Sequence, residues 1–401
     1  MKKITTQATK PAYTLKQLIL YFLKLGFSGF GGPVALVGYM HRDLVEQRKW
    51  ITEEEYKEGL TLAQLAPGPL AAQLGIYLGF VHYHVLGATL VALAFVLPSF
   101  LMVVVLGIFY KMYNGISWMQ AVFYGVGAAV IGIIFISSYK LTVKSVGKFN
   151  AESFTKNWLL WIFYIAAFAI TFIYQTEMLL LFIAAGLIYM FSKAPPSFSK
   201  SNITRSILLF TGIGFWNYNA KTLKELAWFF TKAGAFVFGS GLAIIPFLHG
   251  AVTKYHWINE HEFLDAVAVA MITPGPVVIT VGFIGYLVAG FPGACIAAAA
   301  TFLPCYLFTV IPAPYFKKYA KNRSIKAFVD GITSAVIGAL TGSVIIIAIN
   351  TFTQNHSVFI DIPSVLVALA TMLVLLYIKK IQEPYIILIA AIVGLILKLL
   401  L

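Results

Sequence analysis

The sequence carries very little charge. Only 11% of its 401 residues are charged, whereas soluble domains carry about a quarter. Hydrophobic residues make up 60% of the chain, and too few polar residues are left to cover a soluble core of that size. Lipid removes this difficulty, provided that backbone groups pair within helices or closed barrels. Long apolar runs without strand-like alternation favour helices, so we expect an all-α polytopic membrane protein.

Cysteine is nearly absent. The two cysteines, Cys295 and Cys305, lie in one apolar stretch, which disfavours a disulfide framework or a cysteine-based metal site. The sequence also lacks a nucleotide-binding loop and a paired nucleophile and base, which disfavours an ATP-driven pump or an enzyme. It has no fingerprint for a flavin, haem or nicotinamide, and we expect no cofactor. The net charge is +14, but the basic residues lie in short loops between apolar runs, so nucleic acid is not an expected partner.

The chain contains an internal duplication. An offset of about 207 residues aligns the two halves in order, with drifts of one residue. The matched positions include Lys24 with Lys232, Gly26 with Gly234, His41 with His249, Trp50 with Trp257, Glu58 with Asp265, Pro67-Gly68-Pro69 with Pro274-Gly275-Pro276, Pro98 with Pro304, and Gly132 with Gly338. The predicted units are a first repeat over 1–192, a linker over 193–220 with an extra crossing near 206–218, and a second repeat over 221–401.

Each half follows the same plan. A glycine-interrupted apolar segment and a polar loop come first, then an amphipathic segment that runs into a Pro-Gly-Pro break. Plain apolar helices follow, near 85–110, 118–139, 157–174 and 178–192 in the first half and near 290–311, 327–350, 362–378 and 385–401 in the second.

The basic residues alternate between matching loops. The loop after residue 110 holds only Lys111, whereas its partner in the second half holds five basic residues, and the bias reverses again in the following loops. By the positive-inside rule the halves then have opposite orientations, as in the inverted repeats of secondary transporters. The basic residues of 41–57 also favour two re-entrant hairpins, over 14–40 and 58–82, that leave this loop on the side of the N-terminus.

The interrupted segments are the candidate binding region. Glycine and proline end a helix at membrane depth, which is tolerated only around a cavity or inside protein. The half-helices that restart there direct unpaired N–H groups and a positive dipole end into the break, and such ends bind anions. The candidate substrate-binding residues are Lys24, Gly31, Gly32, Pro33, Pro67, Gly68, Pro69, Gln73, Lys232, Gly239, Ser240, Gly241, Pro274, Gly275, Pro276 and Thr280, with Gln64 as a further hydrogen-bond donor.

Ionisable residues in these segments have two interpretations each. Lys24 and Lys232 either attract the anion or extend to the membrane interface. Glu58 and Asp265 either carry protons for coupling or lie at helix entrances. Histidine in general titrates near neutral pH, so His41 and His249 either respond to pH or anchor at the interface, which is the more common role. Thr52 with Glu55 and Asn259 with Glu262 are typical of capping boxes and are interpreted as structural.

The motifs resemble those of the chromate ion transporter family, in its long two-domain form. The resemblance rests on Phe30-Gly31-Gly32-Pro33, the Trp50-Ile51 loop and Ala66-Pro67-Gly68-Pro69, with a second copy at Phe238-Gly239-Ser240-Gly241 and Thr273-Pro274-Gly275-Pro276. It implies proton-driven export of chromate across the inner membrane of a bacterium, giving chromate resistance, with sulfate as a competing oxyanion. The second copy lacks the proline of the first, so its half-helix is expected to start less sharply.

Two other functions stay open at this stage. One is transport of another small anion on the same frame, and the other is a non-transport role as an intramembrane enzyme or a structural membrane protein. The expected partners are the oxyanion, the lipid bilayer and a second copy of the chain in a homodimer.

Overall fold

The computed structural model describes residues 12–30, 32–113, 116–175, 179–196, 220–239, 241–316, 322–353, 361–378 and 381–400. In that part of the chain four helices are long and apolar enough to cross a membrane: Leu70–Tyr113, Ser117–Ser145, Val277–Tyr315 and Arg323–Phe352. The chain is therefore an all-α polytopic membrane protein, as the composition predicts. The extra crossing expected at 206–218 lies outside the described residues.

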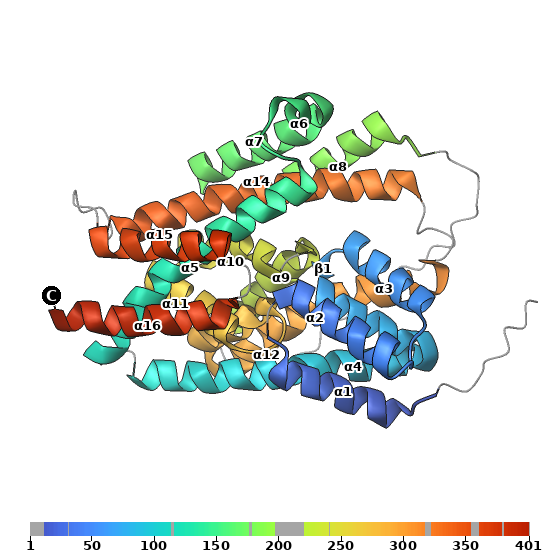
Figure 1. Ribbon diagram of the computed structural model, residues 1–401, viewed down its shortest axis with the longest axis horizontal. Helices are drawn as coiled ribbons and strands as arrows, with labels where there is room; N and C mark the ends of the chain where they lie inside the picture. The colour runs from blue at the N-terminus through green and yellow to red at the C-terminus, as the bar shows by residue number, and fades with distance from the viewer. Residues whose placement is uncertain are drawn as a thin grey trace, which may run out of the picture.

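The helices of both halves follow the predicted order (Figure 1). The first half contains α1 (Leu15–Ser28), α2 (Gly32–Met40), the π-helix η1 (His41–Gln47), α3 (Glu53–Leu65), β1 (Gly68–Pro69), α4 (Leu70–Tyr113), α5 (Ser117–Ser145), α6 (Ala151–Lys156), α7 (Trp158–Tyr174) and α8 (Leu179–Lys193). The second contains α9 (Ala220–Ala235), β2 (Phe238–Gly239), η2 (Gly241–Ile244), α10 (Ile245–Thr253), α11 (Glu260–Ile272), η3 (Val277–Ile279), α12 (Thr280–Val310), η4 (Ala313–Tyr315), α14 (Arg323–Phe352), α15 (Ile362–Tyr377) and α16 (Glu383–Leu400).

Two of the long helices reverse direction inside their bounds. The backbone of α4 leaves helical geometry at His84, and that of α12 does so at Ala289 and Gly290. At the first reversal the two arms touch, and a Cβ built on Gly79 would lie 2.6 Å from the carbonyl oxygen of Gly87. Glycine at these positions therefore allows the arms to fold back on each other.

The first half contains two helix pairs, α1 with α2 and α3 with the first arm of α4, over the ranges in which the sequence predicts hairpins. The ring of Tyr13, before α1, stacks on Trp50 at 5.0 Å between centroids. The hydroxyl of Tyr83, at the end of the first arm of α4, donates to the carbonyl of Tyr13 at 2.5 Å. The start of α1, the loop before α3 and the reversal in α4 thus meet at one end, away from the helix breaks. This meeting point is called the corner of the first half. The 14 residues of α1 span about 21 Å, less than the ~30 Å of a bilayer core.

The corresponding corner of the second half lies at the far end of α4. Tyr110, near the end of the long arm 85–113, donates a hydrogen bond to Asp265 of α11 at 2.7 Å. His261 of α11 lines a cavity there together with Tyr124 of α5 and Asp361. At 1.5 Å per residue the long arm separates the two corners by about 40 Å.

The halves exchange their last helices. Helices α7 and α8 of the first half pack on α14 of the second, where Gly338 lies against the carbonyl of Tyr164. Helices α15 and α16 of the second half pack on α5 of the first, and a Cβ on Gly132 would lie 2.7 Å from the carbonyl oxygen of Ala368. The two sequence repeats are therefore interleaved in space, and one buried core includes residues of both.

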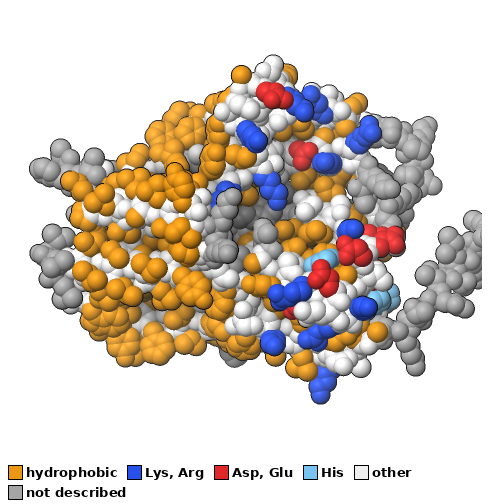
Figure 2. All heavy atoms as spheres, viewed as in Figure 1, with side chains coloured by type: hydrophobic (Ala, Val, Ile, Leu, Met, Phe, Trp, Pro, Cys, Tyr) orange, Lys and Arg blue, Asp and Glu red, His pale blue; other side chains and the backbone are white. Residues whose placement is uncertain are grey.

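Charged side chains are unevenly distributed over the surface. On the face shown in Figure 2 they gather at the end formed by α1 to α3 and around α6, whereas the other end is almost entirely apolar. A wide apolar surface of this kind is what lipid contact requires.

Candidate functional site at the crossing of the helix breaks

The breaks of the two halves meet at the centre of the molecule. β1 pairs in parallel with β2, with Gly68 opposite Phe238 and Pro69 opposite Gly239. The N–H of Gly68 donates to the carbonyl of Val237 at 2.5 Å, and the N–H of Gly275 donates to the carbonyl of Gly29 at 2.9 Å. These two bonds are equivalent under the repeat offset. Each Pro-Gly-Pro break is therefore hydrogen-bonded to the first break of the other half. The place where these four segments meet, at Gly29, Gly68, Val237 and Gly275, is called the crossing.

The glycines of this crossing adopt backbone conformations that suit glycine alone. Gly32, Gly68 and Gly275 have φ of +70°, +143° and +99°, a region that L-residues rarely enter. A Cβ on Gly68 would also lie 2.7 Å from Nε2 of Gln73. The predicted role of these glycines as backbone breaks is confirmed.

Several helices start at the crossing. α4 begins at Leu70 directly after Pro69, and Pro33 is the second residue of α2. In the second half η3 and α12 follow Pro276, and the buried Pro274 precedes the turn. The first N–H groups of such helices have no partner within their own helix, and they carry the positive end of the dipole.

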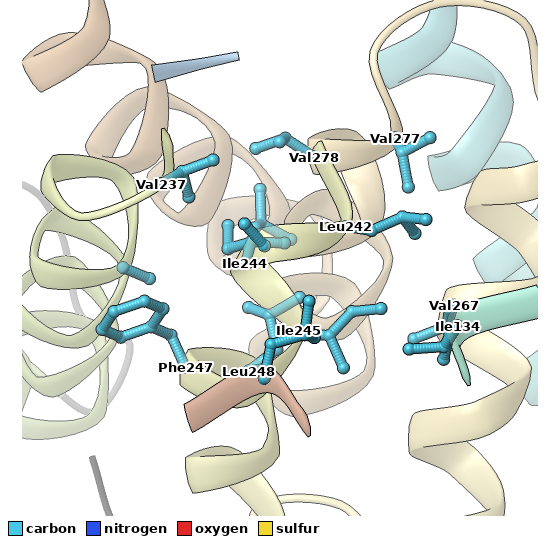
Figure 3. Close-up of a cluster of buried hydrophobic side chains, with 14 of the residues drawn as sticks. Ile134, Val237, Leu242, Ile244, Ile245, Phe247, Leu248, Val267, Val277 and Val278 are labelled. Carbon is cyan, nitrogen blue, oxygen red and sulfur yellow. The ribbon is translucent and has the colours of Figure 1, made fainter. Parts of the chain in front are cut away.

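The second half restarts less sharply, as expected from its missing proline. Gly241 opens a 3₁₀ segment of four residues, and α10 begins only at Ile245. The side chains around this segment are apolar (Figure 3), and Leu242, Ile244 and Val278 are buried there. Gly31 and Ser240, both predicted site residues, lie outside the described residues.

Two polar side chains predicted at the second breaks are buried. Gln73 is fully buried, and its Nε2 donates to the carbonyl of Pro67 at 2.8 Å. Its Oε1 is also buried and has no hydrogen-bond partner among the described residues. Thr280 donates to the carbonyl of Val277 at 2.7 Å and is buried. Gln64 is exposed and does not join them.

Neither predicted lysine faces the crossing in this conformation. Lys24 is exposed, on the same face of α1 as the exposed Leu20 and Phe27, whereas the opposite face packs on α4. The ammonium of Lys232 lies 5.4 Å from the ring centroid of Trp228, which is itself 63% exposed. Lys24 therefore lies on an outer face of α1, whereas Lys232 is half-buried beside Trp228.

The matched acidic residues each accept a hydrogen bond from a tyrosine, but in different surroundings. Tyr77 donates to Glu58 at 3.2 Å, and Glu58 is half-buried beside an opening of about 500 Å³. Tyr110 donates to Asp265 at 2.7 Å, and Asp265 is buried beside a cavity of about 200 Å³. The two openings lie at opposite ends of the long arm of α4.

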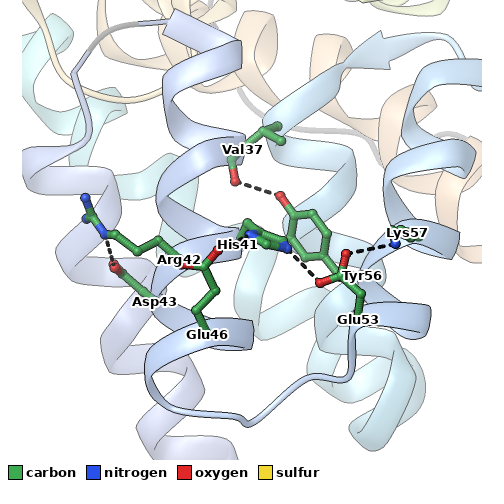
Figure 4. Close-up of polar contacts among 8 residues, drawn as sticks. All are labelled: Val37, His41, Arg42, Asp43, Glu46, Glu53, Tyr56 and Lys57. Atoms are coloured by element: carbon green, nitrogen blue, oxygen red, sulfur yellow. Dashed lines mark hydrogen bonds and ion pairs between the residues drawn. The ribbon is translucent and has the colours of Figure 1, made fainter.

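The matched histidines tie each first hairpin to the next helix. His41 Nε2 lies 2.8 Å from a carboxylate oxygen of Glu53, at the start of α3 (Figure 4). His249 Nε2 lies 2.9 Å from Glu260, at the start of α11. In the first half, the hydrogen bond between His41 and Glu53 lowers the pKa of Glu53 below its ordinary value. Sequence reasoning missed these glutamates, although both stand at matched positions of the repeat.

The capping boxes are confirmed in both halves. Thr52 and Glu55 bond each other's backbone N–H at the start of α3, and Asn259 and Glu262 do the same at the start of α11. These residues fix helix ends at the two corners, so they position the hairpins without reaching the crossing.

Two residues at the crossing were missed from the sequence. Ser99 and Cys305 are both fully buried, and they lie against Gly275 and Gly68 respectively. The signal was available, because each directly follows a matched proline, Pro98 or Pro304. In the described part of the chain no cluster of three or more His, Cys, Asp or Glu residues is suited to a metal ion.

Comparisons with known proteins agree over both halves. The family model described as "Chromate transporter" matches residues 16–190 and 224–395. The chain is 61% identical over 393 residues to the "Chromate transport protein" of Cupriavidus metallidurans, covering 97% of this chain and 94% of that protein. It is 56% identical over 395 residues to the "Probable chromate transport protein" of Synechococcus elongatus, covering 96% of each.

A more distant relative matches most of the chain as well. Identity to the "Chromate transport protein" of Pseudomonas aeruginosa is 29% over 357 residues, covering 86% of this chain and 83% of that protein. No solved structure matches the chain.

Proposed function

The chain belongs to the chromate transporter family, which consists of transporters rather than enzymes, and on that premise we propose that it exports chromate from the cytoplasm in exchange for protons. The proposed location is the bacterial inner membrane, and the consequence for the cell is chromate resistance. Sulfate and similar tetrahedral oxyanions compete for the site because they match chromate in shape and charge. A homodimer stays a prediction of the sequence.

The observation that carries the binding site is the reciprocal pairing of the breaks. The bonds from Gly68 to Val237 and from Gly275 to Gly29 bring helix starts of both halves to one place. Unpaired N–H groups and positive dipole ends at helix starts stabilise an anion without any charged side chain. This suits a site in which neither Lys24 nor Lys232 makes direct contact.

Transport in this proposal uses the two halves as inverted repeats. Two observations support it: the corners of the halves lie at opposite ends of the long arm of α4, and the loop charges alternate between matching positions. Rocking of one half against the other would expose the crossing first to one side and then to the other.

Proton coupling is assigned to Glu58 and Asp265. Both are acidic residues at matched positions, each bonded by a tyrosine, and they face openings at opposite ends of the molecule. An ionisable group at membrane depth is costly and is therefore a candidate for function. In this proposal the two positions, which differ in burial, exchange surroundings as the halves rock.

The test is uptake of labelled chromate into inverted vesicles, with and without a proton gradient that is acidic inside. Accumulation that depends on the gradient is the expected result, and excess unlabelled sulfate should reduce it. The variant Asp265→Asn should abolish the dependence on the gradient. Asp330→Asn, which changes a half-buried carboxylate of α14 away from both openings, is the matched control and should keep it.

The other outcomes separate the parts of the proposal. Uptake of chromate that does not depend on the gradient would support chromate as the substrate and contradict proton coupling. If vesicles that contain the folded chain move neither chromate nor sulfate, the chain transports a different anion.

A further inference from the structure

Ser99 and Cys305 occupy equivalent places on the two helix arms that cross the molecule. Ser99 lies on the long arm of α4 and Cys305 on the second arm of α12, each directly after a proline. A Cβ built on Gly68 would lie 2.9 Å from Sγ of Cys305, and one built on Gly275 would collide with Oγ of Ser99. Each Pro-Gly-Pro break of one half is therefore completed by a side chain that lies on the other half's crossing arm.

Both side chains are buried, and among the described residues neither has a strong hydrogen-bond partner. Both are 0% exposed. The Ser99 hydroxyl reaches the carbonyl oxygen of Gly26 only at 3.4 Å, which is at the weak limit of a hydrogen bond. A hydroxyl and a thiol therefore lie beside the two Pro-Gly-Pro breaks, where each can contact a ligand.

A second observation at the same place indicates a ligand. Gln73 is 0% exposed, and its Nε2 and the Cys305 sulfur both converge on Gly68. The Oε1 atom of Gln73 is buried with no hydrogen-bond partner among the described residues. Burying an unpaired amide oxygen costs about 1–3 kcal/mol, and a ligand that brings an O–H donor, from the anion itself or from its hydration water, would remove this cost.

We propose that Ser99 and Cys305 line the translocation path and contact the oxyanion at two chemically different poles of its site. The first pole is the hydroxyl pole, with Ser99, Gly275 and Thr280. The second is the thiol pole, with Cys305, Gly68 and Gln73. This inference rests on the proposed function of the crossing as an anion site.

The two poles give the site a polarity that the repeat by itself would not have. A hydroxyl is a good donor to an oxyanion, whereas a thiol is a weak one. The Ser99 hydroxyl, whose hydrogen bond to Gly26 is weak, and the unpaired Oε1 of Gln73 at the thiol pole fit an oxyanion that carries a proton or a water on one side. The two poles should therefore contribute differently to affinity and to the choice between oxyanions.

The native cysteines allow a direct test. In Cys295→Ser, Cys305 is the sole thiol of the chain. The purified variant is reconstituted in liposomes, and its reaction with methyl methanethiosulfonate is followed by intact mass. Cys305 should react under transport conditions and should react about tenfold more slowly at a chromate concentration ten times its Kd, in proportion to the free site. The mass also shows whether chromate has oxidised the thiol, and sulfate serves as a non-oxidising probe.

The matched control is Cys305→Ser, which leaves the partly exposed Cys295 on the same helix. Its labelling should not change with chromate. A Cys305 that never reacts while the chain transports chromate, or that reacts at the same rate with and without chromate, overturns the proposal, because a side chain in the path becomes accessible in each cycle. If the chain moves no chromate but sulfate protects Cys305 from labelling, the proposal of chromate transport is wrong. The proposal that Cys305 lines an oxyanion site is then still supported.

Kinetics provide a second, independent readout. Ser99→Ala should raise the chromate KM about fivefold through loss of one hydrogen bond. Cys305→Ala should change KM less than Ser99→Ala does and should alter the ratio of chromate to sulfate transport. Equal effects of the two substitutions on both quantities would contradict the assignment of two different poles.

Discussion

At the residue scale, the crossing depends on the absence of a side chain at Gly68. Its φ of +143° disfavours any L-residue, and a Cβ there would meet Gln73 and Cys305. Gly68→Ala should reduce chromate transport at least tenfold, because the strain, about 1–3 kcal/mol, falls on the bond to Val237. The measurement is uptake by proteoliposomes. Gly38→Ala, on α2 where a Cβ has open space, is the matched control and should transport normally.

The positions of Lys24 and Lys232, which do not face the crossing, predict a modest role. Charges that act on the crossing only from a distance contribute little to binding, because solvent and salt screen them. The double variant Lys24→Gln with Lys232→Gln should raise the chromate KM by less than about threefold and leave the maximal rate nearly unchanged. Loss of transport in this variant would mean that the lysines turn toward the crossing in another conformation.

The pKa of Glu55 makes the first-half corner sensitive to acid. A hydrogen bond from His82 is the main cause that lowers the pKa of Glu55 to about 2. Because the folded value lies below the unfolded one, this stability is complete above about pH 4.5. It is lost as the pH falls from there through about 2.

Thermal unfolding in detergent between pH 7 and pH 3 checks this expectation. Glu55→Gln should lower the Tm at pH 7 and flatten its decline with acid, whereas Glu54→Gln, at an exposed neighbour, should leave both as they are. A Glu55→Gln curve parallel to that of the unchanged chain would refute the assignment.

At the scale of the helix, glycines set where the exchanged helices dock. Gly125 of α5 lies against the backbone of α16 at Ala390 and Gly394. Gly125→Ala should lower the Tm by several degrees, because neither backbone can retreat and overpacking costs about 1–3 kcal/mol. Gly127→Ala on the same helix meets only Leu264 at 3.6 Å, so it should be neutral or stabilising. Similar Tm values for the two variants would show that α16 does not dock at Gly125.

The start of the second half-helix shows what local sequence can predict. Pro33 opens α2 directly, whereas the second copy lacks this proline and begins with the 3₁₀ segment η2. The capping boxes at Thr52 and Asn259 were also predictable, since each motif needs only neighbours along the chain. The places of Ser99 and Cys305 were not, because their contacts join residues that are far apart in sequence.

At the scale of the whole molecule, the inverted arrangement predicts opposite accessibility of two corners. In a background without native cysteines, His84→Cys and His256→Cys place thiols at exposed positions of the two corners. A membrane-impermeant thiol reagent should label His256→Cys in whole cells and His84→Cys only in inverted vesicles. Labelling of both from the same side would refute the inverted repeat, and labelling of a lysed sample controls for reactivity.

The sequence by itself determined the membrane class, the helices, the duplication and the helix breaks. It did so because apolar run length, glycine, proline and capping residues act over a few positions of chain. The tertiary structure decided how the halves exchange their last helices, which breaks pair, and which side chains reach the crossing. Lys24 shows the difference: its place before a break suggested contact with the anion, but the packing of α1 on α4 turns it outward. Only the packing of distant segments settles which face of a helix is buried.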